Sequence, residues 1–583
     1  MLEAKLTDLG YQLKVNPSVP KPGIYAIDIE TDESDKPNFV GLGLSAWSGP
    51  KVVYYFSQLT PQLKECLERS HLIGHNVKSD IKWLRGWGCK IKAAQIYHDS
   101  MIMAYSRCTT EENYGLKKLA EKELGWKWPS YREMVGKGKA KKTLDKQEVE
   151  RVANYCGMDT AASLELCYLY LERNKLDKRV SAPNWLKYYY QIELPIYRLL
   201  LDMETEGIRL DVSSLSKLDG SYQQIISTLE RQLTAVVPNP NSPKQILEVL
   251  FPRLGIREKS TGAKVLKRYA EKHEIIKTIL QYRKYTKLQG TYTGAFLSLS
   301  SLPMVHSRFN QVSYNTSTES SFGIRTGRLS CSEPNLQNIP SHGQDGDSLR
   351  SLFIPRESYL LYCADYSQIE YRLLAHFSQE PVLLKAFEQG KDAHAATAQV
   401  IYGLDEITKE QRNIGKTVNF AAIYGAQARK VAETTGLSEE ECQTFLDSYF
   451  AKLPRVTSWI TRTKFKAHSD GGVTTLFGRF IPLPGLKSRD RYEKWHWERA
   501  AVNYIIQGSA AEVIKLAMLR VQKVGFLPSL TVHDELLFEI RPSELKVRGR
   551  LIKSIMEHIV YLSAPLVVDA GSGKNWCEAK GAS

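Results

Sequence analysis

The chain has 583 residues, which is too long for one hydrophobic core and suggests three or four domains of about 150 residues each. Hydrophobic residues make up 43% and charged residues 25%, an ordinary balance for a globular protein, and no run of about 18 apolar residues is present to span a bilayer. The net charge of +15 suits a polyanionic partner such as nucleic acid, although a solvated basic surface gives the same total.

The nine cysteines form no CxxC pair, which favours reduced thiols over a zinc site or a disulfide framework. The N-terminal segment MLEAKLTDLGYQLK has acidic residues early and no apolar core, so it does not read as a signal peptide. We therefore expect an intracellular, cytoplasmic protein that makes no membrane contact and acts as a monomer.

The first third of the chain is predicted to be an α/β domain. The runs GIYAIDIE (23–30) and FVGLGLS (39–45) have the composition of adjacent strands. Helical patterns extend from 61 to 170, interrupted at 135–142 by a loop that carries four lysines. The segment KRVSAPNW (178–185) has the composition of a linker.

The remainder of the chain is predicted to be mostly helical, with strands in two places. Helical periodicity resumes at 193 and continues to 290, and it returns over 380–470 and 498–520. Residues 305–375 have a mixed pattern. The run TVHDELLFEI (531–540) reads as one strand that carries His, Asp and Glu in its middle.

A first group of carboxylates lies in the predicted α/β domain. Asp28 and Glu30 are two residues apart and therefore project from the same face of a strand. Two further carboxylates are each four residues from a polar partner on a predicted helix: Asn76 with Asp80, and Tyr155 with Asp159.

By itself, the Asp28–Glu30 pair reads as a strand end that turns into a polar loop. Four carboxylates on three elements instead favour a site for two Mg²⁺-like ions, which could activate a water for phosphodiester hydrolysis. In that reading Tyr155 orients the attacking water.

A second group of carboxylates lies in the C-terminal half. Asp365 follows an apolar, strand-like run, and Asp534 lies within the run 531–540. If the two strands are neighbours, the two aspartates cannot both remain ionised without a cation between them. A pair of Mg²⁺ ions satisfies both and leaves coordination positions open for the oxygens of a triphosphate.

A predicted helix at 408–425 supplies complementary charge. It begins at TKEQ, which fits a capping box with Thr408 as N-cap and Gln411 reaching back. One stripe of this helix then carries two cations and two aromatic residues at four-residue spacing: Arg412, Lys416, Phe420 and Tyr424. The stripe reads equally well as a solvated basic face and as a clamp for a nucleoside triphosphate.

These motifs resemble two known families. The series DIE, NxxxD and YxxxD is similar to proofreading 3′–5′ exonucleases of the DEDD family in their tyrosine-bearing form. The runs DYSQIEYR, RxxxKxxxF…YG and HDE resemble motifs A, B and C of family A DNA polymerases, the bacterial DNA polymerase I type. Further matches at TGRLSCSEPNLQNIP, DAHAATA, RAAVNYIIQGSAAEVIK and GSGKNW extend the resemblance over residues 20–580.

The resemblance implies an α/β exonuclease domain of the ribonuclease H-like type, followed by a right-hand polymerase with an antiparallel palm sheet and helical fingers and thumb, α+β overall. It also implies a division of the chain: exonuclease 1–180, linker and start of the polymerase domain 181–211, thumb 212–300, first part of the palm 301–374, fingers 375–497, and second part of the palm 498–583.

The resemblance further implies the roles of single residues. Two Mg²⁺ ions per active site, replaceable by Mn²⁺, are expected on Asp365 and Asp534 and on Asp28, Glu30, Asp80 and Asp159. The dNTP is expected to contact His394, Arg412, Lys416, Phe420 and Tyr424, with Glu370 blocking the 2′-hydroxyl of a ribonucleotide. Primer–template DNA is expected to contact Arg328, Asn503, Gln507 and His533.

Some positions depart from the family pattern. Relatives often carry an aromatic residue where this chain has Ser79 and glycine where it has Ala421, and LFGRFIPLP holds one arginine in place of a basic cluster. We expect these differences to affect local packing, fingers motion and a template contact, and to leave the catalytic groups in place.

We expect a DNA polymerase with proofreading and no 5′ nuclease domain, encoded by a bacterium or by a virus or phage and located in the cytoplasm, with an organelle as the alternative location. A single-subunit RNA polymerase shares the palm chemistry, but Glu370 and the exonuclease motifs disfavour it. A non-catalytic primer–template binding protein has no physical reason to retain six uncompensated acids in a basic chain.

Overall fold

The computed structural model describes residues 5–34, 37–136, 141–176, 185–237, 239–299, 301–315, 320–341 and 343–581. Most of the predicted linker (178–184) and part of the lysine-rich loop (137–140) therefore lie outside the described residues. None of the helices in the described ranges is both long and apolar enough to cross a membrane.

The N-terminal domain is built on a six-stranded sheet of order β1-β4-β3-β2-β5-β6. Strands β2, β3 and β4 are antiparallel neighbours, whereas β2, β5 and β6 run parallel. Its elements are β1 Gln12–Val15, β2 Ile24–Thr31, β3 Phe39–Ala46, β4 Val52–Phe56, α1 Pro61–Glu68, β5 His71–Gly74, α2 Lys78–Gly86, β6 Ile96–Asp99, α3 Ser100–Arg107, α4 Leu116–Leu124, α5 Tyr131–Val135 and α6 Val149–Leu176.

The predicted strands at 23–30 and 39–45 are present, but the prediction of helices throughout 61–170 is wrong at two places. Short strands β5 and β6 interrupt it, because four-residue parallel strands that are buried in a sheet give no alternating pattern in the sequence. Asn76 also lies outside helix α2, in the left-handed region at φ +62°, so it does not share a helix face with Asp80.

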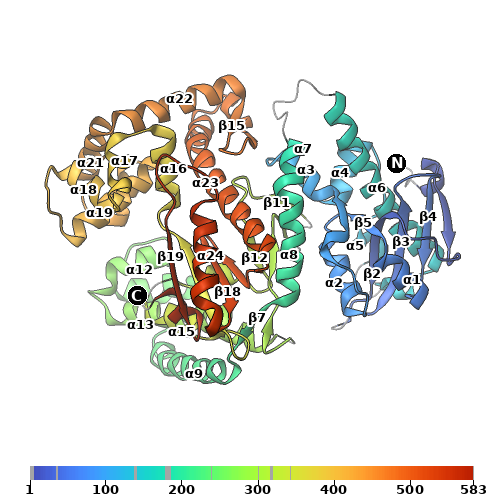
Figure 1. Cartoon of the computed structure of the whole chain (residues 1–583). Helices are drawn as coiled ribbons and strands as arrows, with labels where there is room; N and C mark the ends of the chain where they lie inside the picture. The colour runs from blue at the N-terminus through green and yellow to red at the C-terminus, as the bar shows by residue number, and fades with distance from the viewer. Residues whose placement is uncertain are drawn as a thin grey trace.

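A linking segment joins this domain to the rest of the chain. Helix α8 passes between the two parts in Figure 1, and its apolar residues belong to both hydrophobic cores: Tyr197 and Leu201 pack with the first domain, and Leu199 with the second. The elements here are α7 Trp185–Tyr188, a π-helical turn Tyr189–Glu193, α8 Leu194–Glu206, and the small sheet of β7 Ile208–Leu210, β8 Met304–Val305 and β13 Phe353–Ile354.

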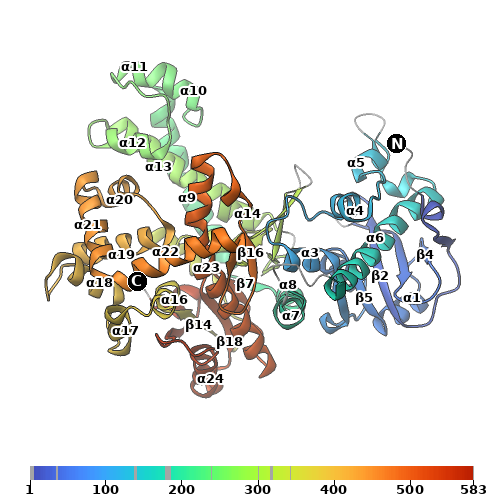
Figure 2. The same cartoon turned by 90° about the horizontal axis from the view of Figure 1, so that it is seen from above.

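A helical arm follows β7. Figure 2 shows α10 to α13 extending away from the body of the molecule at the end of the long helix α9. The tip has its own small core, which includes Leu233, Phe251 and Ile279. The arm consists of α9 Val212–Thr234, α10 Pro243–Gln245, α11 Phe251–Arg253, α12 Ala263–Ala270, α13 Glu274–Leu288 and α14 Gly294–Leu297.

The centre of the second part is a four-stranded antiparallel sheet of order β17-β18-β14-β19. The long helix α23 packs against helices α8, α16 and α24. The elements are β9 Arg308–Asn310, β10 Val312–Asn315, β11 Ser320–Gly323, β12 Ser330–Ser332, α15 Gln344–Arg350, β14 Leu360–Tyr366, α16 Ile369–Ser378, α23 Arg491–Lys523, β17 Leu530–Val532, β18 Glu535–Ile540, α24 Leu545–Glu557, β19 Val568–Gly573 and α25 Trp576–Lys580.

The run 531–540 is therefore a hairpin and not the single strand that its composition predicts. β17 and β18 pair antiparallel around the two residues His533 and Asp534, and His533 adopts φ +52°. β-formers on both sides of a two-residue turn look like one continuous strand in the sequence, because His533 gives no Gly or Asn turn signal.

A second helical lobe is inserted between α16 and α23 (Figure 1). Helix α19 begins one residue after Thr408, whose hydroxyl accepts a hydrogen bond from Gln411 N at 3.2 Å, as the capping box predicts. The lobe contains α17 Pro381–Glu388, α18 Ala393–Tyr402, α19 Lys409–Tyr424, α20 Ala428–Thr435, α21 Glu439–Lys452, α22 Pro454–Asp470 and the hairpin β15 Gly472–Thr474 with β16 Phe480–Pro482.

Candidate active sites

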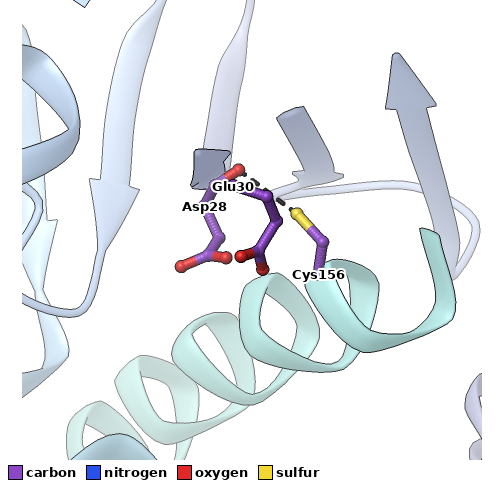
Figure 3. Close-up of side chains that lie close together, drawn as sticks. All are labelled: Asp28, Glu30 and Cys156. Carbon is purple, nitrogen blue, oxygen red and sulfur yellow. Dashed lines mark hydrogen bonds between the residues drawn. The ribbon is translucent and has the colours of Figure 1, made fainter. Parts of the chain in front are cut away.

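The first acidic cluster forms where helix α6 crosses strand β2. Asp28 and Glu30 project from β2 toward α6, as Figure 3 shows, and Cys156 of α6 lies beside them. Ligand atoms of these three residues lie within 4.8 Å of one another. The Cys156 thiol donates to the backbone carbonyl of Asp28 at 3.4 Å, which ties the helix to the strand.

The other two carboxylates reach the cluster from different elements. Asp80 in the first turn of α2 accepts a hydrogen bond from Ile29 N at 3.2 Å, which places it against β2. Asp159 on α6 is buried and accepts from the indole N–H of Trp128 at 2.9 Å. The fold thus brings together the four carboxylates of the predicted site.

The electrostatics of this cluster fit a divalent cation. Burial, and next the charge of Asp159, raise the pKa of Glu30 to about 8, and burial raises the pKa of Asp80 to about 8. The pKa of Asp28 is raised well above its usual range by burial and by the surrounding carboxylates. Such acids ionise together only when a cation neutralises them, and oxygen donors are the ligands that Mg²⁺ prefers.

Tyr155 lies on α6 next to the cluster. It is buried, and the ammonium of Lys117 is 4.0 Å from the centre of its ring. Burial, with the charges of Asp159 and Glu30, raises the pKa of the Tyr155 phenol well above its usual range, so the hydroxyl keeps its proton. A protonated phenol beside the carboxylates can orient a water molecule.

Sequence reasoning missed three residues of this site. Lys117, Trp128 and Cys156 contact Tyr155, Asp159 and Asp28 respectively. Only Cys156 had a local signal, because it directly follows Tyr155 on the same helix. Trp128 is 31 residues from Asp159, and no periodicity links the two.

The second cluster lies at one end of the central sheet. Asp365 is near the end of β14, and Asp534 is in the turn between β17 and β18. Tyr366 N donates to the carbonyl of Asp534 at 3.1 Å, so the two backbones are adjacent. The structure thus brings Asp365 and Asp534 to one site from positions 169 residues apart.

Two cations lie beside these aspartates. The Arg328 guanidinium forms an ion pair with Glu370 and lies 3.7 Å from Asp534 Oδ1. The ammonium of Lys580 is 3.4 Å from Asp365 Oδ2. Sequence reasoning assigned Arg328 to DNA and missed Lys580, which approaches from the C-terminal helix α25.

The properties of the Asp534 carboxylate also suit the role of a metal ligand. Its Oδ1 is buried and has no hydrogen-bond partner, although buried polar atoms rarely lack one. Burial, with Glu370 and Asp365 nearby, raises its pKa to about 7 against the opposing effect of Arg328. Glu535 differs: it is buried and already bonded to the Trp576 indole and to Lys580.

The stripe on α19 faces this cluster at its C-terminal end. The rings of Phe420 and Tyr424 stack with centroids 5.9 Å apart. Tyr424 donates to Glu370 Oε2 at 2.8 Å and accepts from the Gln507 side chain at 3.0 Å. Arg412, two turns before Phe420, is bonded through Nε to Asp392 at 3.1 Å.

Three of the residues predicted to contact the dNTP or the DNA differ in their surroundings: His394, Lys416 and Asn503. His394 is buried between Tyr371 and Phe420, and its Nδ1 lies 2.9 Å from the amide nitrogen of Asn419. Burial lowers its pKa to about 4, so the ring is neutral. Lys416 is exposed, and the side-chain oxygen of Asn503 is buried with no hydrogen-bond partner.

Fold and sites together define a protein with two acidic centres, one in an α/β domain and one at the end of an antiparallel sheet that is flanked by helical lobes. The profile of DNA polymerase family A matches residues 212–578, and that of a 3′-5′ exonuclease domain matches residues 16–174. Since the first match covers more than half of the chain, the chain belongs to DNA polymerase family A, and the predicted family and fold class are confirmed.

Relatives match over most of the chain. DNA polymerase I of Synechocystis is 34% identical over 99% of the chain and 62% of its own length. The enzymes of Bacillus subtilis (34%; 85% of the chain, 56% of the relative) and Thermus aquaticus (37%; 70% and 51%) are similar. The chain thus spans between half and two thirds of these relatives.

A solved structure also matches nearly the whole chain. The POL domain of Pol1 from M. smegmatis, in complex with DNA primer-template and dNTP, is 28% identical, with a TM-score of 0.80 over 98% of this chain and all of that one.

Proposed function

We propose that the chain is a template-directed DNA polymerase that adds dNTPs to a primer 3′-hydroxyl and removes mismatched 3′ ends with its exonuclease centre. The observation that carries this proposal is the adjacency of Asp365 and Asp534 below the α19 stripe, in a chain of DNA polymerase family A. Family membership supports the substrates, primer–template DNA and dNTPs.

We assign the metal-binding role to six carboxylates. Asp365 and Asp534 would hold two Mg²⁺ ions in the palm, and Asp28, Glu30, Asp80 and Asp159 would hold two in the exonuclease centre. When bound, such ions, or Mn²⁺ in their place, neutralise phosphate oxygens and lower the pKa of the attacking hydroxyl or water.

The protein's own groups position the nucleotide. Arg412 and Lys416 bind the triphosphate. Arg412 would leave its hydrogen bond with Asp392 to bind a phosphate oxygen instead. Phe420 packs against the sugar and base. His394, which is neutral, serves as a hydrogen-bonding neighbour of the phosphates and not as a cation. Tyr424 covers the templating position.

Glu370 acts as the sugar gate. It is 8% exposed and held by Arg328 and Tyr424, and a carboxylate fixed in this way supports a role in blocking the 2′-hydroxyl of a ribonucleotide. Arg328, Asn503, Gln507 and His533 bind the primer–template minor groove, whose acceptors occupy equivalent places in every Watson–Crick pair. In the exonuclease centre, the protonated Tyr155 hydroxyl orients the attacking water.

The predicted division of the chain stands as part of this proposal. The α9–α14 arm is the thumb, the lobe from α17 to β16 is the fingers, and the central sheet is the palm, with residues 1–180 forming the exonuclease domain. We expect a cytoplasmic monomer.

Two single variants test the proposal, because each should lose one of the two activities and keep the other. Asp534→Ala should abolish primer extension while digestion of a mismatched primer end continues with Mg²⁺. Asp28→Ala should abolish digestion while extension continues. Extension by Asp534→Ala at the wild-type rate would refute the palm assignment, and persistent digestion by Asp28→Ala would refute the exonuclease assignment.

A further inference from the structure

A buried ion pair crosses from the exonuclease domain to the rest of the chain at the start of helix α2. The ammonium of Lys78, the first residue of α2, lies 2.6 Å from Glu204 Oε1 near the end of α8. The two side chains are 8% and 2% exposed. The match to the exonuclease family ends at residue 174, so Glu204 belongs to the part of the chain that follows it. Removal of one partner from such a buried pair is strongly destabilising.

The carboxylate of Glu204 also binds strand β9. Its Oε1 accepts a hydrogen bond from Phe309 N at 2.9 Å, and the Lys78 ammonium donates to the carbonyl of Phe309 at 2.8 Å. Phe309 belongs to the hydrophobic core of the second part, and β9 pairs antiparallel with β12. The first side chain of α2 is thus fixed between two elements, α8 and β9, that lie outside its own domain.

The backbone of the same turn is held from α8 as well. The first N–H groups of a helix have no partner within that helix, and Val77, the residue before α2, has no side chain that could cap them. Val77 N donates within the domain, to Asp99 Oδ2 at 2.8 Å. Lys78 N donates instead to the hydroxyl of Tyr197 on α8, at 3.0 Å. The start of α2 therefore takes part of its position from α8.

Asp80 of the exonuclease cluster lies in this turn, two residues after Lys78. Its side chain accepts a hydrogen bond from Ile29 N at 3.2 Å, between Asp28 and Glu30 on β2. A functional site requires its ligands within about 0.5 Å of the productive geometry. A shift of the first turn of α2 would move Asp80 relative to the other carboxylates and so weaken their common binding of a cation.

We propose that Lys78 and Glu204 are positioning residues of the exonuclease centre, and that the part of the chain after the exonuclease domain completes the geometry at Asp80 through α8 and β9. In this role the pair holds the turn from which Asp80 reaches the cluster. The inference rests on the proposed function, because it concerns metal binding by the four carboxylates. It also gives the junction a role beyond attachment, since digestion then depends on contacts made outside the exonuclease domain.

The test measures Mn²⁺ binding to the full chain by the decrease of the electron paramagnetic resonance signal of the free ion. The parent carries Asp534→Ala, which disables the second cluster, and Asp28→Ala on this background identifies the binding that belongs to the exonuclease centre. Glu204→Gln keeps the size of the side chain and removes its charge. It should raise the Kd for Mn²⁺ about tenfold, the lower end of the range for partners that orient metal ligands.

Further variants separate the ion pair from the fold. Lys78→Met should raise the Kd as Glu204→Gln does, and Lys78→Arg should restore binding, because a pocket of about 340 Å³ borders Lys78 and leaves room for a guanidinium. Tyr197→Phe removes only the hydroxyl that accepts from Lys78 N, so it should raise the Kd by a smaller factor. Melting temperatures show which variants are folded in the assay, and Tyr197→Phe decides the matter if the charge variants are not.

Digestion of a mismatched primer end gives a second readout. At low Mg²⁺, Glu204→Gln should lower kcat about tenfold and leave KM for the DNA unchanged. Excess Mg²⁺ should restore the rate, which it would not do after a general loss of structure.

Glu193→Gln is the matched control at the same junction. It breaks an equally buried pair, but the hydrogen-bond partners of Glu193, Lys515 and Gln311, lie outside α2. This variant should lower the melting temperature as Glu204→Gln does and leave the Kd for Mn²⁺ unchanged.

The proposal is overturned if Glu204→Gln and Tyr197→Phe both bind Mn²⁺ with the Kd of the parent, or if Glu193→Gln weakens binding equally. Failure of the proposed function gives a different result: the wild-type chain with Mg²⁺ would leave a mismatched primer end undigested, whatever the Mn²⁺ affinities of the variants.

Discussion

Single residues balance the charge of the two acidic centres in different ways. At the second cluster, Arg328 and Lys580 lie within 4 Å of Asp534 and Asp365. In the exonuclease centre, the charge of Lys117 opposes the burial that raises the pKa of Asp159, and the neutral Trp128 indole donates a hydrogen bond to Asp159 at 2.9 Å. A neutral donor orients a carboxylate without neutralising its charge.

Trp128→Phe should therefore slow primer digestion about tenfold, because the loss of a hydrogen bond that orients a metal ligand typically costs 10–100-fold. The phenyl ring keeps most of the buried packing. Two measurements check this prediction: the digestion rate as a function of Mg²⁺ concentration, and isothermal titration of the protein with Mg²⁺. In both, we expect a weaker apparent affinity for the metal. Primer extension serves as the internal control; an unchanged digestion rate contradicts the positioning role.

Glu370→Ala should admit ribonucleotides, because it removes the buried carboxylate that Arg328 and Tyr424 hold in place. The measured quantity is the ratio of kcat/KM for rNTP and dNTP, and we expect it to rise. Glu388→Ala, in an exposed position on α17, is the matched control and should leave the ratio unchanged. An unaltered ratio in Glu370→Ala would remove this residue as the gate.

At the scale of elements, the α19 helix depends on its first turn. Thr408 and Gln411 bond reciprocally, at 3.2 Å from Gln411 N to Thr408 Oγ1 and 2.8 Å from Thr408 N to Gln411 Oε1. This capping box fixes the start of the helix, and Arg412 follows at the next position. The stripe of Arg412, Lys416, Phe420 and Tyr424, for which we propose nucleotide binding, is thus set in register by a local interaction.

Thr408→Ala should weaken that first turn by about 1 kcal/mol, the usual cost of an N-cap loss. Amide hydrogen exchange in the first turn of α19 should become about fivefold faster, since exchange follows the free energy of local opening. Ser438→Ala removes the equivalent cap of α21 and should leave α19 unaffected. Equal protection of α19 in wild type and Thr408→Ala would show that tertiary packing alone holds the turn.

At the scale of the whole molecule, buried ion pairs join the two parts. Glu193, before α8, lies 2.7 Å from the Lys515 ammonium on α23, and both side chains are almost fully buried. Glu512 lies on α23, one turn before Lys515, and pairs with Arg479. Arg479 in turn donates to the carbonyl of Thr326, two residues before Arg328. The junction and the loop that leads to the Asp365–Asp534 cluster therefore share one network.

Glu193→Gln should destabilise the full chain by about 3–5 kcal/mol, because it leaves the Lys515 ammonium buried without its counter-charge. The midpoint of urea unfolding should fall accordingly. Glu65→Gln breaks an exposed pair with Arg69 and should cost less than about 1 kcal/mol. A midpoint equal to that of wild type would mean that the pair does not hold the junction.

Local geometry accounts for what could be predicted from the sequence. Residues two apart on a strand or four apart on a helix share a face whatever the rest of the chain does, so Asp28 with Glu30 and Tyr155 with Asp159 were placed correctly within their elements. The capping box at Thr408 has the same local origin. The motif order, also a property of the linear chain, identified the family.

Tertiary structure alone decided which remote groups meet. Trp128 reaches Asp159, Lys580 reaches Asp365, and His394 turns toward Asn419, because packing of separate elements brings those atoms together and no spacing in the chain encodes it. The hairpin at Asp534 is local, but it was missed because its two turn residues give no turn signal in the sequence. Sequence determined the chemistry of each element, and the fold determined the partners, since burial and pairing depend on distances that only the folded chain defines.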